Sequence, residues 1–154
     1  MKKLILLLLI GAGAYEYLER NPEIRQLFQP LENSVSAIGF DYSPDDQLLE
    51  NAFKDRKSNL QIGSEGQVIR LLPDDLQGNR HQRFILQLAT GQTLLVAHNI
   101  DLAPRINALR VGDHVRFYGE YEWNQKGGVI HWTHHDPRGR HEDGWLMHNG
   151  HIYK

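Results

Sequence analysis

The sequence predicts an all-β fold with a minor helical component, and three observations support this class. Between residues 64 and 134, five apolar segments of strand length alternate with turn sequences rich in Gly, Asn and Asp. A helix start, Ser43-Pro44-Asp45-Asp46, precedes the first segment, and a short helical pattern begins near Pro104, between the third and the fourth. The 154-residue chain is long enough for one such domain and an N-terminal appendage.

The first 14 residues have the composition of an export signal. Met1-Lys2-Lys3 is followed by an apolar run from Leu4 to Ala14, about half of the roughly 20 residues that a membrane-spanning helix needs. We therefore expect residues 1–14 to be a signal peptide, which places the protein in the periplasm or outside the cell. The alternative is an uncleaved inner-membrane anchor, which is the only membrane contact that we expect. Residues 15–43 are expected to be a tether.

Residues 44–60 are expected to contain a helix that docks on the domain behind it. Ser43 is suited to cap this helix, Pro44 fits its first turn, and acidic residues follow near its positive end. The apolar stripe that would face the domain consists of Leu48, Leu49, Ala52 and Phe53.

Residues 61–154 are expected to form a small five-stranded OB-type barrel with a C-terminal hairpin. Three strands, a short helix and two strands is the element order of OB barrels. A different small barrel, of the SH3 type, is the alternative. Asn149-Gly150 is a turn signal between two short apolar segments, which predicts the hairpin. The predicted strands are 66–72, 81–88, 93–98, 114–123 and 128–134, and the helix is 103–109.

The first barrel hairpin is predicted to bring basic side chains together. If Leu88 faces Thr93 across the turn, Arg83 faces His98 on the side away from the core. An ordinary solvated surface is the alternative interpretation. The candidates here are His81 and Arg83 for ligand binding, and His98, Asp101 and Arg105 for catalysis.

The second barrel hairpin is predicted to pair a carboxylate with an imidazole. If Trp123 faces Gly128, Glu120 faces His131, and the carboxylate can orient the ring. Three further pairs follow from this register: Gly119 with a core-facing Trp132, Tyr118 with Thr133, and Arg116 with His135. The candidates here are Glu120 and His131 for catalysis, and Arg116, Tyr118 and His135 for ligand binding.

Nine histidines, all from His81 onward, offer ligands for a metal site. His131, His134 and His135 are the candidate ligands for zinc or another divalent cation. In a regular strand His131 and His134 point to opposite faces, so one ion requires a bulge or ligands from elsewhere. The chain has no Cys, which excludes thiolate metal sites and disulfides.

Three strings of residues are unusual: 80–84 (RHQRF), 98–106 (HNIDLAPRI) and 127–137 (GGVIHWTHHDP). They resemble a bacterial domain-of-unknown-function family of small exported proteins, over roughly residues 64–153. The resemblance implies a compact domain made for export, and it carries no activity or catalytic residue. The calcium-binding acids and paired arginines of OB-type thermonucleases are not found in clear form.

These features support three functions. The first is an exported module that binds an anionic, oligonucleotide-like or saccharide-like ligand, because residues 80–154 hold nine Lys and Arg against seven Asp and Glu. The net charge of −2 argues against a strongly basic, nonspecific nucleic-acid binder. The second is a histidine-based hydrolase of phosphodiesters or similar esters, with or without metal. The third is an interaction protein of the cell envelope. The aromatic residues that could stack on a ligand are Tyr118, Tyr121, Trp123 and Trp132.

Overall fold

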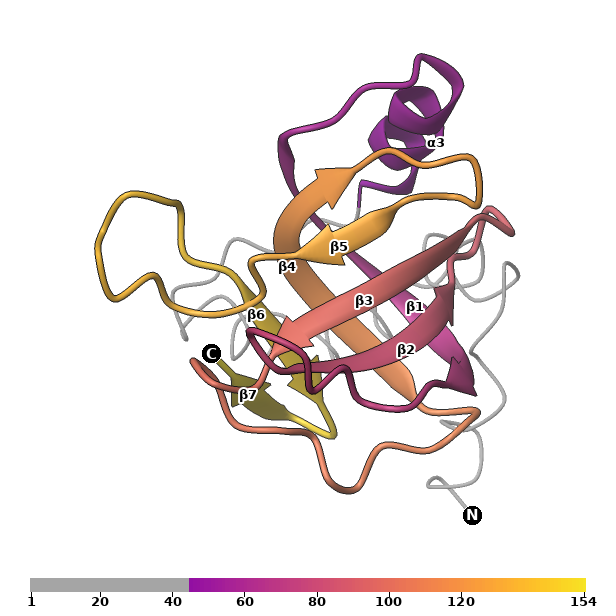
Figure 1. Cartoon of the computed structure of the whole chain (residues 1–154). Coiled ribbons are helices and arrows are strands. Elements are labelled where there is room, and N and C mark those ends of the chain that lie inside the picture. The colour runs from indigo at the N-terminus through magenta and orange to yellow at the C-terminus, as the bar shows by residue number, and fades with distance from the viewer. Residues whose placement is uncertain (1–44) are drawn as a thin grey trace, which may run out of the picture. The chain divides into compact units, whose positions relative to one another are not determined.

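Seven strands and one helix make up residues 45–154, the part of the chain that this computed structural model describes (Figure 1). The expected signal peptide, 1–14, and tether, 15–43, lie outside the described residues. In chain order the elements are α3 (Asp46–Lys54), β1 (Leu60–Leu71), β2 (His81–Gln87), β3 (Thr93–Asn99), β4 (His114–Glu122), β5 (Val129–His131), β6 (Trp145–His148) and β7 (His151–Tyr153).

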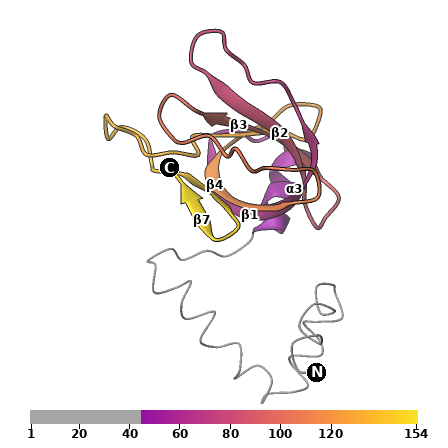
Figure 2. The ribbon, with the colours of Figure 1, turned by 90° about the horizontal axis from the view of Figure 1, so that it is seen from below.

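The first five strands close into a barrel. Their order is β1-β2-β3-β5-β4, and β4 pairs back onto β1. β3 and β5 run parallel, with Leu95 opposite Val129, whereas the other neighbours run antiparallel. This closed order is that of an OB barrel, so the predicted fold class is confirmed. The β6–β7 hairpin pairs with β4: Leu146 of β6 belongs to the buried core, and β7 is the edge strand of the sheet (Figure 2).

The helix α3 closes one end of the barrel (Figure 1). Leu49 and Ala52 are buried against the core. The helix begins later than the sequence predicts, because the carboxylate of Asp45 caps it by accepting the N–H of Leu48 at 2.9 Å. Ser43 and Pro44, the expected cap and first-turn residue, lie outside the described residues. Trp123 joins β4 to the helix, since its indole N–H donates to the Phe53 carbonyl at 3.1 Å.

The expected helix at 103–109 is absent, and turns connect β3 to β4 instead. Side chains from the strands make the hydrogen bonds that a helix would make internally. The Gln82 amide bonds the N–H and the carbonyl of Ile106, at 2.8 and 2.9 Å, and the His98 ring bonds the Pro104 carbonyl at 3.1 Å. Ile106 and Leu109 are buried all the same, so this segment still contributes to the core.

The register of the β2–β3 hairpin differs from the prediction by one residue. Gln87, not Leu88, faces Thr93, and Gln82, not Arg83, faces His98. The reason is a three-residue loop, in which Leu88 N–H bonds the Gln92 carbonyl at 2.9 Å and Gly91 adopts φ +86°. A shift of one residue exchanges the two faces of a strand. The side chain of His98 therefore points into the barrel.

The register of the β4–β5 hairpin is as predicted as far as His131, which faces Glu120. Beyond it the chain leaves the sheet at Trp132, which adopts φ +52°. The pairs expected further along are therefore wrong. β6 takes that place beside β4, so that Trp145 faces Tyr118 and Met147 faces Arg116.

Candidate functional site

A cleft of about 430 Å³ lies on the outer face of β2 and β3, beside the end of β5. One wall consists of the two strands, with Ala97 between polar residues, and Asn79 of the β1–β2 loop lies at its edge. The other wall is the segment 132–140, which follows β5. OB barrels bind oligonucleotides and oligosaccharides on this face of strands 2 and 3. Besides Asn79, the polar residues that line the cleft are His81, Asn99, Asp101, His131, His134, Asp136, Arg138 and Arg140.

Both carboxylates of the cleft are held by groups of the protein. Asp101 accepts the backbone N–H and the side-chain Nε–H of Arg80, at 2.7 and 2.6 Å, and these bonds lower the pKa of its carboxyl. The buried carboxylate of Asp136 accepts backbone N–H groups of Arg138, Arg140 and His141 at 2.7–2.9 Å, which likewise lowers its pKa. The protein therefore already occupies part of the hydrogen-bond accepting capacity of each carboxylate.

Asp136 organises the loop between β5 and β6, which extends beside the barrel in Figure 1. Its own N–H donates to Asp143 at 2.9 Å, and Asp143 also bonds the exposed ring of His135 at 2.6 Å. The carboxylates at both ends of this loop thus fix the backbone of the segment between them, including Arg138 and Arg140.

The remaining charged groups of the cleft are basic. Arg138 and Arg140 are exposed, and they make no ion pair with a carboxylate of residues 45–154. His134 donates its Nδ1–H to the carbonyl of His135 at 2.8 Å, since a carbonyl can only accept. This bond leaves Nε2 of His134 as the ring atom that can bond a ligand. The cleft therefore offers two guanidinium groups and several imidazoles.

Trp132 supplies an aromatic surface to the cleft. Its ring stacks on His141 with 4.1 Å between centroids and 3° between planes, and it lies 5.3 Å from the ring of His134. The expected burial of Trp132 over Gly119 is wrong, because the chain turns outward at this residue. Thr133 occupies the interior position instead, and a Cβ built on Gly119 would lie 2.9 Å from its methyl group.

His98 is a core residue and not part of the cleft. Its side chain has no solvent exposure. Its Nε2–H donates to the Pro104 carbonyl at 3.1 Å, which leaves Nδ1 to accept the Thr133 hydroxyl at 2.8 Å. Burial lowers the pKa of His98 to about 4. The expected patch of His81, Arg83 and His98 is therefore wrong, since His98 points inward.

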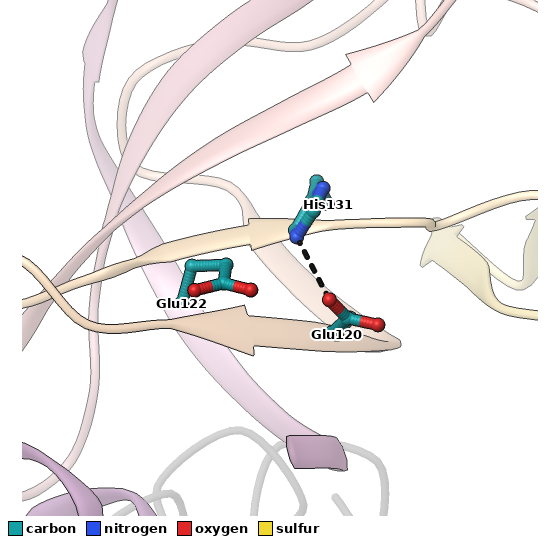
Figure 3. Close-up of side chains that lie close together, drawn as sticks. All are labelled: Glu120, Glu122 and His131. Atoms are coloured by element: carbon teal, nitrogen blue, oxygen red, sulfur yellow. Dashed lines mark ion pairs between the residues drawn. The ribbon is translucent and has the colours of Figure 1, made fainter. Parts of the chain in front are cut away.

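A second cluster lies on the outer face of β4 and β5, where Glu120, Glu122 and His131 point toward one another (Figure 3). Nε2 of His131 lies 3.4 Å from Oε1 of Glu120. The other carboxylate oxygen of Glu120 bonds Nε2 of His141, whose Nδ1–H donates to the Glu142 carbonyl at 2.7 Å. His131 also lines the cleft, so it joins the two groups of residues.

The carboxylate affects the two rings of this cluster differently. Burial lowers the pKa of His131, and the charge of Glu120 opposes that effect. Burial also disfavours the cation at His141, but the hydrogen bonds to Glu120 and to the Glu142 carbonyl outweigh it and raise the pKa of His141.

Several predicted site residues are bonded elsewhere. Arg83 donates to the Pro73 carbonyl, Arg105 pairs with Asp74 at 2.9 Å, and Arg116 pairs with Glu65 at 3.1 Å. The Tyr118 hydroxyl donates to Glu142 at 2.5 Å, and burial together with this carboxylate raises the pKa of Tyr118 to about 12. Of the proposed residues, the structure brings His81, Asp101, His131 and His134 to the cleft, and Glu120 next to it.

The proposed metal ligands His131, His134 and His135 do not meet. The ring of His134 is buried and bonds the carbonyl of His135, whereas the ring of His135 is exposed and bonds Asp143. Of the four aromatic candidates, Trp132 alone lines the cleft. Tyr121 is buried in the core, Tyr118 stacks on Trp145, and Trp123 packs against α3.

Sequence reasoning missed Arg138, Arg140 and Glu122, and it considered His141 only as a further metal ligand. The signal for the two arginines is the string Pro137-Arg138-Gly139-Arg140-His141, which concentrates basic residues directly after Asp136. An Asp followed by such a turn-rich segment favours side-chain-to-backbone bonds. Glu122 lies two residues after Glu120, so it shares the outer face of the same strand.

Among residues 45–154, no helix is long and apolar enough to span a membrane. Comparison with curated proteins gives no match. The model of one protein family, described as "Protein of unknown function (DUF3465)", matches residues 32–154, which confirms the resemblance to a family of unknown function. The chain thus belongs to the DUF3465 family.

Proposed function

We propose that the protein is an exported binding module that holds an anionic ligand in the cleft between β2–β3 and the loop after β5. The observation that carries the proposal is the pair of exposed guanidinium groups in this cleft. Its two acids are already bonded to Arg80 and to the backbone, while Arg138 and Arg140 form no ion pair with a carboxylate of residues 45–154, although the charge of Arg140 acts on Asp136. Guanidinium groups of this kind form strong, charge-assisted bonds with phosphate, sulfate or carboxylate.

The rest of the lining fits a ligand with rings. Trp132 presents a ring that its stacking on His141 holds in place. A stacking surface beside cationic groups is how OB barrels hold nucleotides, and sugar rings use the same kind of surface. His81 and His134 can supply hydrogen bonds from the two sides of the cleft.

Titration of the full chain with a fluorescent oligodeoxythymidine and with a labelled sulfated oligosaccharide tests the proposal. Binding to at least one of them is expected. In Arg138→Ala/Arg140→Ala the affinity should fall about tenfold or more, which corresponds to about 1.4 kcal/mol. The matched control is Arg70→Ala/Arg110→Ala, which removes two exposed guanidinium groups outside the cleft. Equal losses in the two double variants would show nonspecific attraction and overturn the proposal, as would no binding of either probe.

The export part of the proposal is supported by the basic start and the apolar run from Leu4 to Ala14. Cell fractionation of a Gram-negative host should find the chain in the periplasm or on the inner membrane. Leu7→Arg/Leu8→Arg should retain it in the cytoplasm, because the charges interrupt the apolar run. A cytoplasmic location of the unaltered chain would contradict export while leaving the cleft proposal intact.

Hydrolysis of the bound anion is a second candidate, which one observation favours. His131, at the edge of the cleft, is paired with a carboxylate as a general base is. Release of nitrophenolate from bis(4-nitrophenyl) phosphate, lost in His131→Gln but retained in the exposed-ring control His114→Gln, would support it. Binding of the oligomers with no cleavage of any probe would exclude it.

A further inference from the structure

We propose that Glu120, Glu122 and His131 form a binding site for a first-row transition-metal dication, with Zn²⁺ as the reference ion. The site lies on the outer face of β4 and β5 (Figure 3). It differs from the three-histidine set that the sequence predicts, since it keeps only His131. It goes beyond the proposed anion binding and does not depend on it, because neither arginine of the cleft takes part.

The strand register places the three ligands without any bulge. Glu120 and Glu122 are two residues apart on β4 and therefore project from the same face. His131 lies directly opposite Glu120 on β5. One ligand atom from each residue lies within 4.8 Å of the other two.

The spacing of two of these atoms is already that of a zinc site. Ligand atoms about 2.1 Å from a tetrahedral ion lie about 3.4 Å from one another. Nε2 of His131 and Oε1 of Glu120 are 3.4 Å apart. The carboxylate of Glu122 lies within 4.8 Å of both, and its terminal torsion, which has a broad energy minimum, lets its oxygens adjust.

Buried polar atoms without a hydrogen bond mark the same place. Nε2 of His131 is shielded from solvent and, at 3.4 Å from Glu120, forms an ion pair but no hydrogen bond among the described residues. Gln61, the cross-strand neighbour of Glu120 on β1, has both amide atoms in the same condition. Native proteins rarely leave buried polar atoms unpaired, and a bound ion with its water is one of the regular explanations.

His141 lies where its hydrogen bond can orient Glu120 as a metal ligand. Its Nε2 bonds one oxygen of Glu120, which leaves the other oxygen directed toward His131. The ring of His141 is itself fixed by the Glu142 carbonyl and by stacking on Trp132. Hydrogen bonds of this kind to ligating carboxylates are usual in metal sites.

The donor set selects the class of ion. Imidazole suits zinc and its neighbours in the first transition row, whereas Mg²⁺ and Ca²⁺ prefer sites made only of oxygen. Three protein ligands leave one position of a tetrahedral zinc ion for water. Residues 45–154 contain no other group of three or more metal-ligating side chains with this proximity.

Isothermal titration of the full chain, without a histidine tag and after removal of metal by EDTA, tests the proposal. ZnCl₂ should bind with one tight equivalent, and MgCl₂ should not compete. CoCl₂ should give the visible absorption of a four-coordinate ion. In Glu122→Gln and in His131→Gln the zinc affinity should fall at least tenfold. The matched controls are His135→Gln and His114→Gln, whose rings are exposed and lie outside the cluster.

The controls separate a built site from histidine-rich surface binding. Glu122→Gln keeps the shape of its side chain and removes one of two adjacent carboxylate charges, so its melting temperature without metal should not fall. Tight zinc binding that persists in both ligand variants, or that is lost equally in the two control variants, overturns the proposal. So does the absence of a tight equivalent in the unaltered chain, or a preference for Mg²⁺.

Discussion

The side-chain amide of Gln82 forms two hydrogen bonds with the backbone of Ile106, as a neighbouring strand would. Gln82 lies inside the barrel on β2, and its amide accepts the N–H of Ile106 at 2.8 Å and donates to its carbonyl at 2.9 Å. Both partners are buried. This contact holds the β3–β4 connection in turns where the sequence pattern predicts a helix.

Gln82→Met should therefore destabilise the fold by about 3 kcal/mol, because it leaves two buried backbone groups unpaired at about 1–3 kcal/mol each. Urea denaturation followed by tryptophan fluorescence measures the change. Gln87→Met, on the exposed side of the same strand, is the control and should change stability by less than about 0.5 kcal/mol. Equal effects of the two substitutions would contradict the role of Gln82.

His98 should make stability depend on pH. Its pKa is about 4 in the folded barrel and about 6.5 in an unfolded chain, so the unfolded chain binds the extra proton between these values. The free energy of unfolding therefore falls as pH decreases from about 6.5 to about 4, by about 3 kcal/mol from this residue. Repulsion from His134 and His81 adds to the effect of burial in lowering the pKa of His98.

The comparison of His98→Gln with the unaltered chain isolates this contribution. Gln can still donate to the Pro104 carbonyl, but it cannot take up the proton. Denaturation series at several pH values should show a smaller slope in the variant, by up to about 1.4 kcal/mol per pH unit. The same slope in both proteins would mean that His98 does not titrate with unfolding.

Gly144 should tolerate no side chain. A Cβ there would lie 1.9 Å from the carbonyl oxygen of Trp132 and 2.5 Å from that of Tyr118. Gly144→Ala must therefore displace the loop or Trp132, and should cost about 2 kcal/mol or more and shift tryptophan emission. The control is Gly139→Ala in the same loop, where nothing lies within 4 Å and only a φ of +58° opposes the methyl group. It should cost about 1 kcal/mol, and a larger loss than in Gly144→Ala would contradict this packing.

The parts of the site that follow from strand pairing could be predicted, and the parts that follow from loops could not. The Glu120–His131 pair depends only on the turn after Trp123 and on alternation along two strands. The inward direction of the His98 side chain depends on the length of the β2–β3 loop, which has three residues instead of the four expected. The positive φ of Gly91 allows this shorter loop. Residue spacing does not specify that angle.

The cleft wall was beyond prediction for a related reason. Trp132 leaves the sheet one residue after the last ladder pair, so periodicity no longer indicates which side chains meet. From there the chain is positioned by side-chain-to-backbone bonds of Asp136 and Asp143. The helix expected at 103–109 fails likewise, because Gln82 and His98 compete for its backbone groups. Local patterns do not include partners that are distant in the chain.

Asp136 offers a test that separates the position of the arginines from simple charge. Asp136→Ala removes a negative charge from the cleft, and on Coulomb attraction alone this should strengthen the binding of an anion. The carboxylate, however, holds the backbone N–H groups of Arg138, Arg140 and His141. Without it the loop loses its fixed conformation, and both guanidinium groups must be ordered again when the ligand binds.

We therefore expect Asp136→Ala to weaken the binding of whichever anionic probe binds the unaltered chain, by about tenfold. Asp101→Ala is the matched control, since its carboxylate lines the same cleft but bonds Arg80 and not the loop. That substitution should leave affinity equal or increased. Hydrogen exchange of the amides of residues 138–141 should rise in Asp136→Ala and not in Asp101→Ala. Stronger anion binding in Asp136→Ala would show that net charge, and not the position of Arg138 and Arg140, controls affinity.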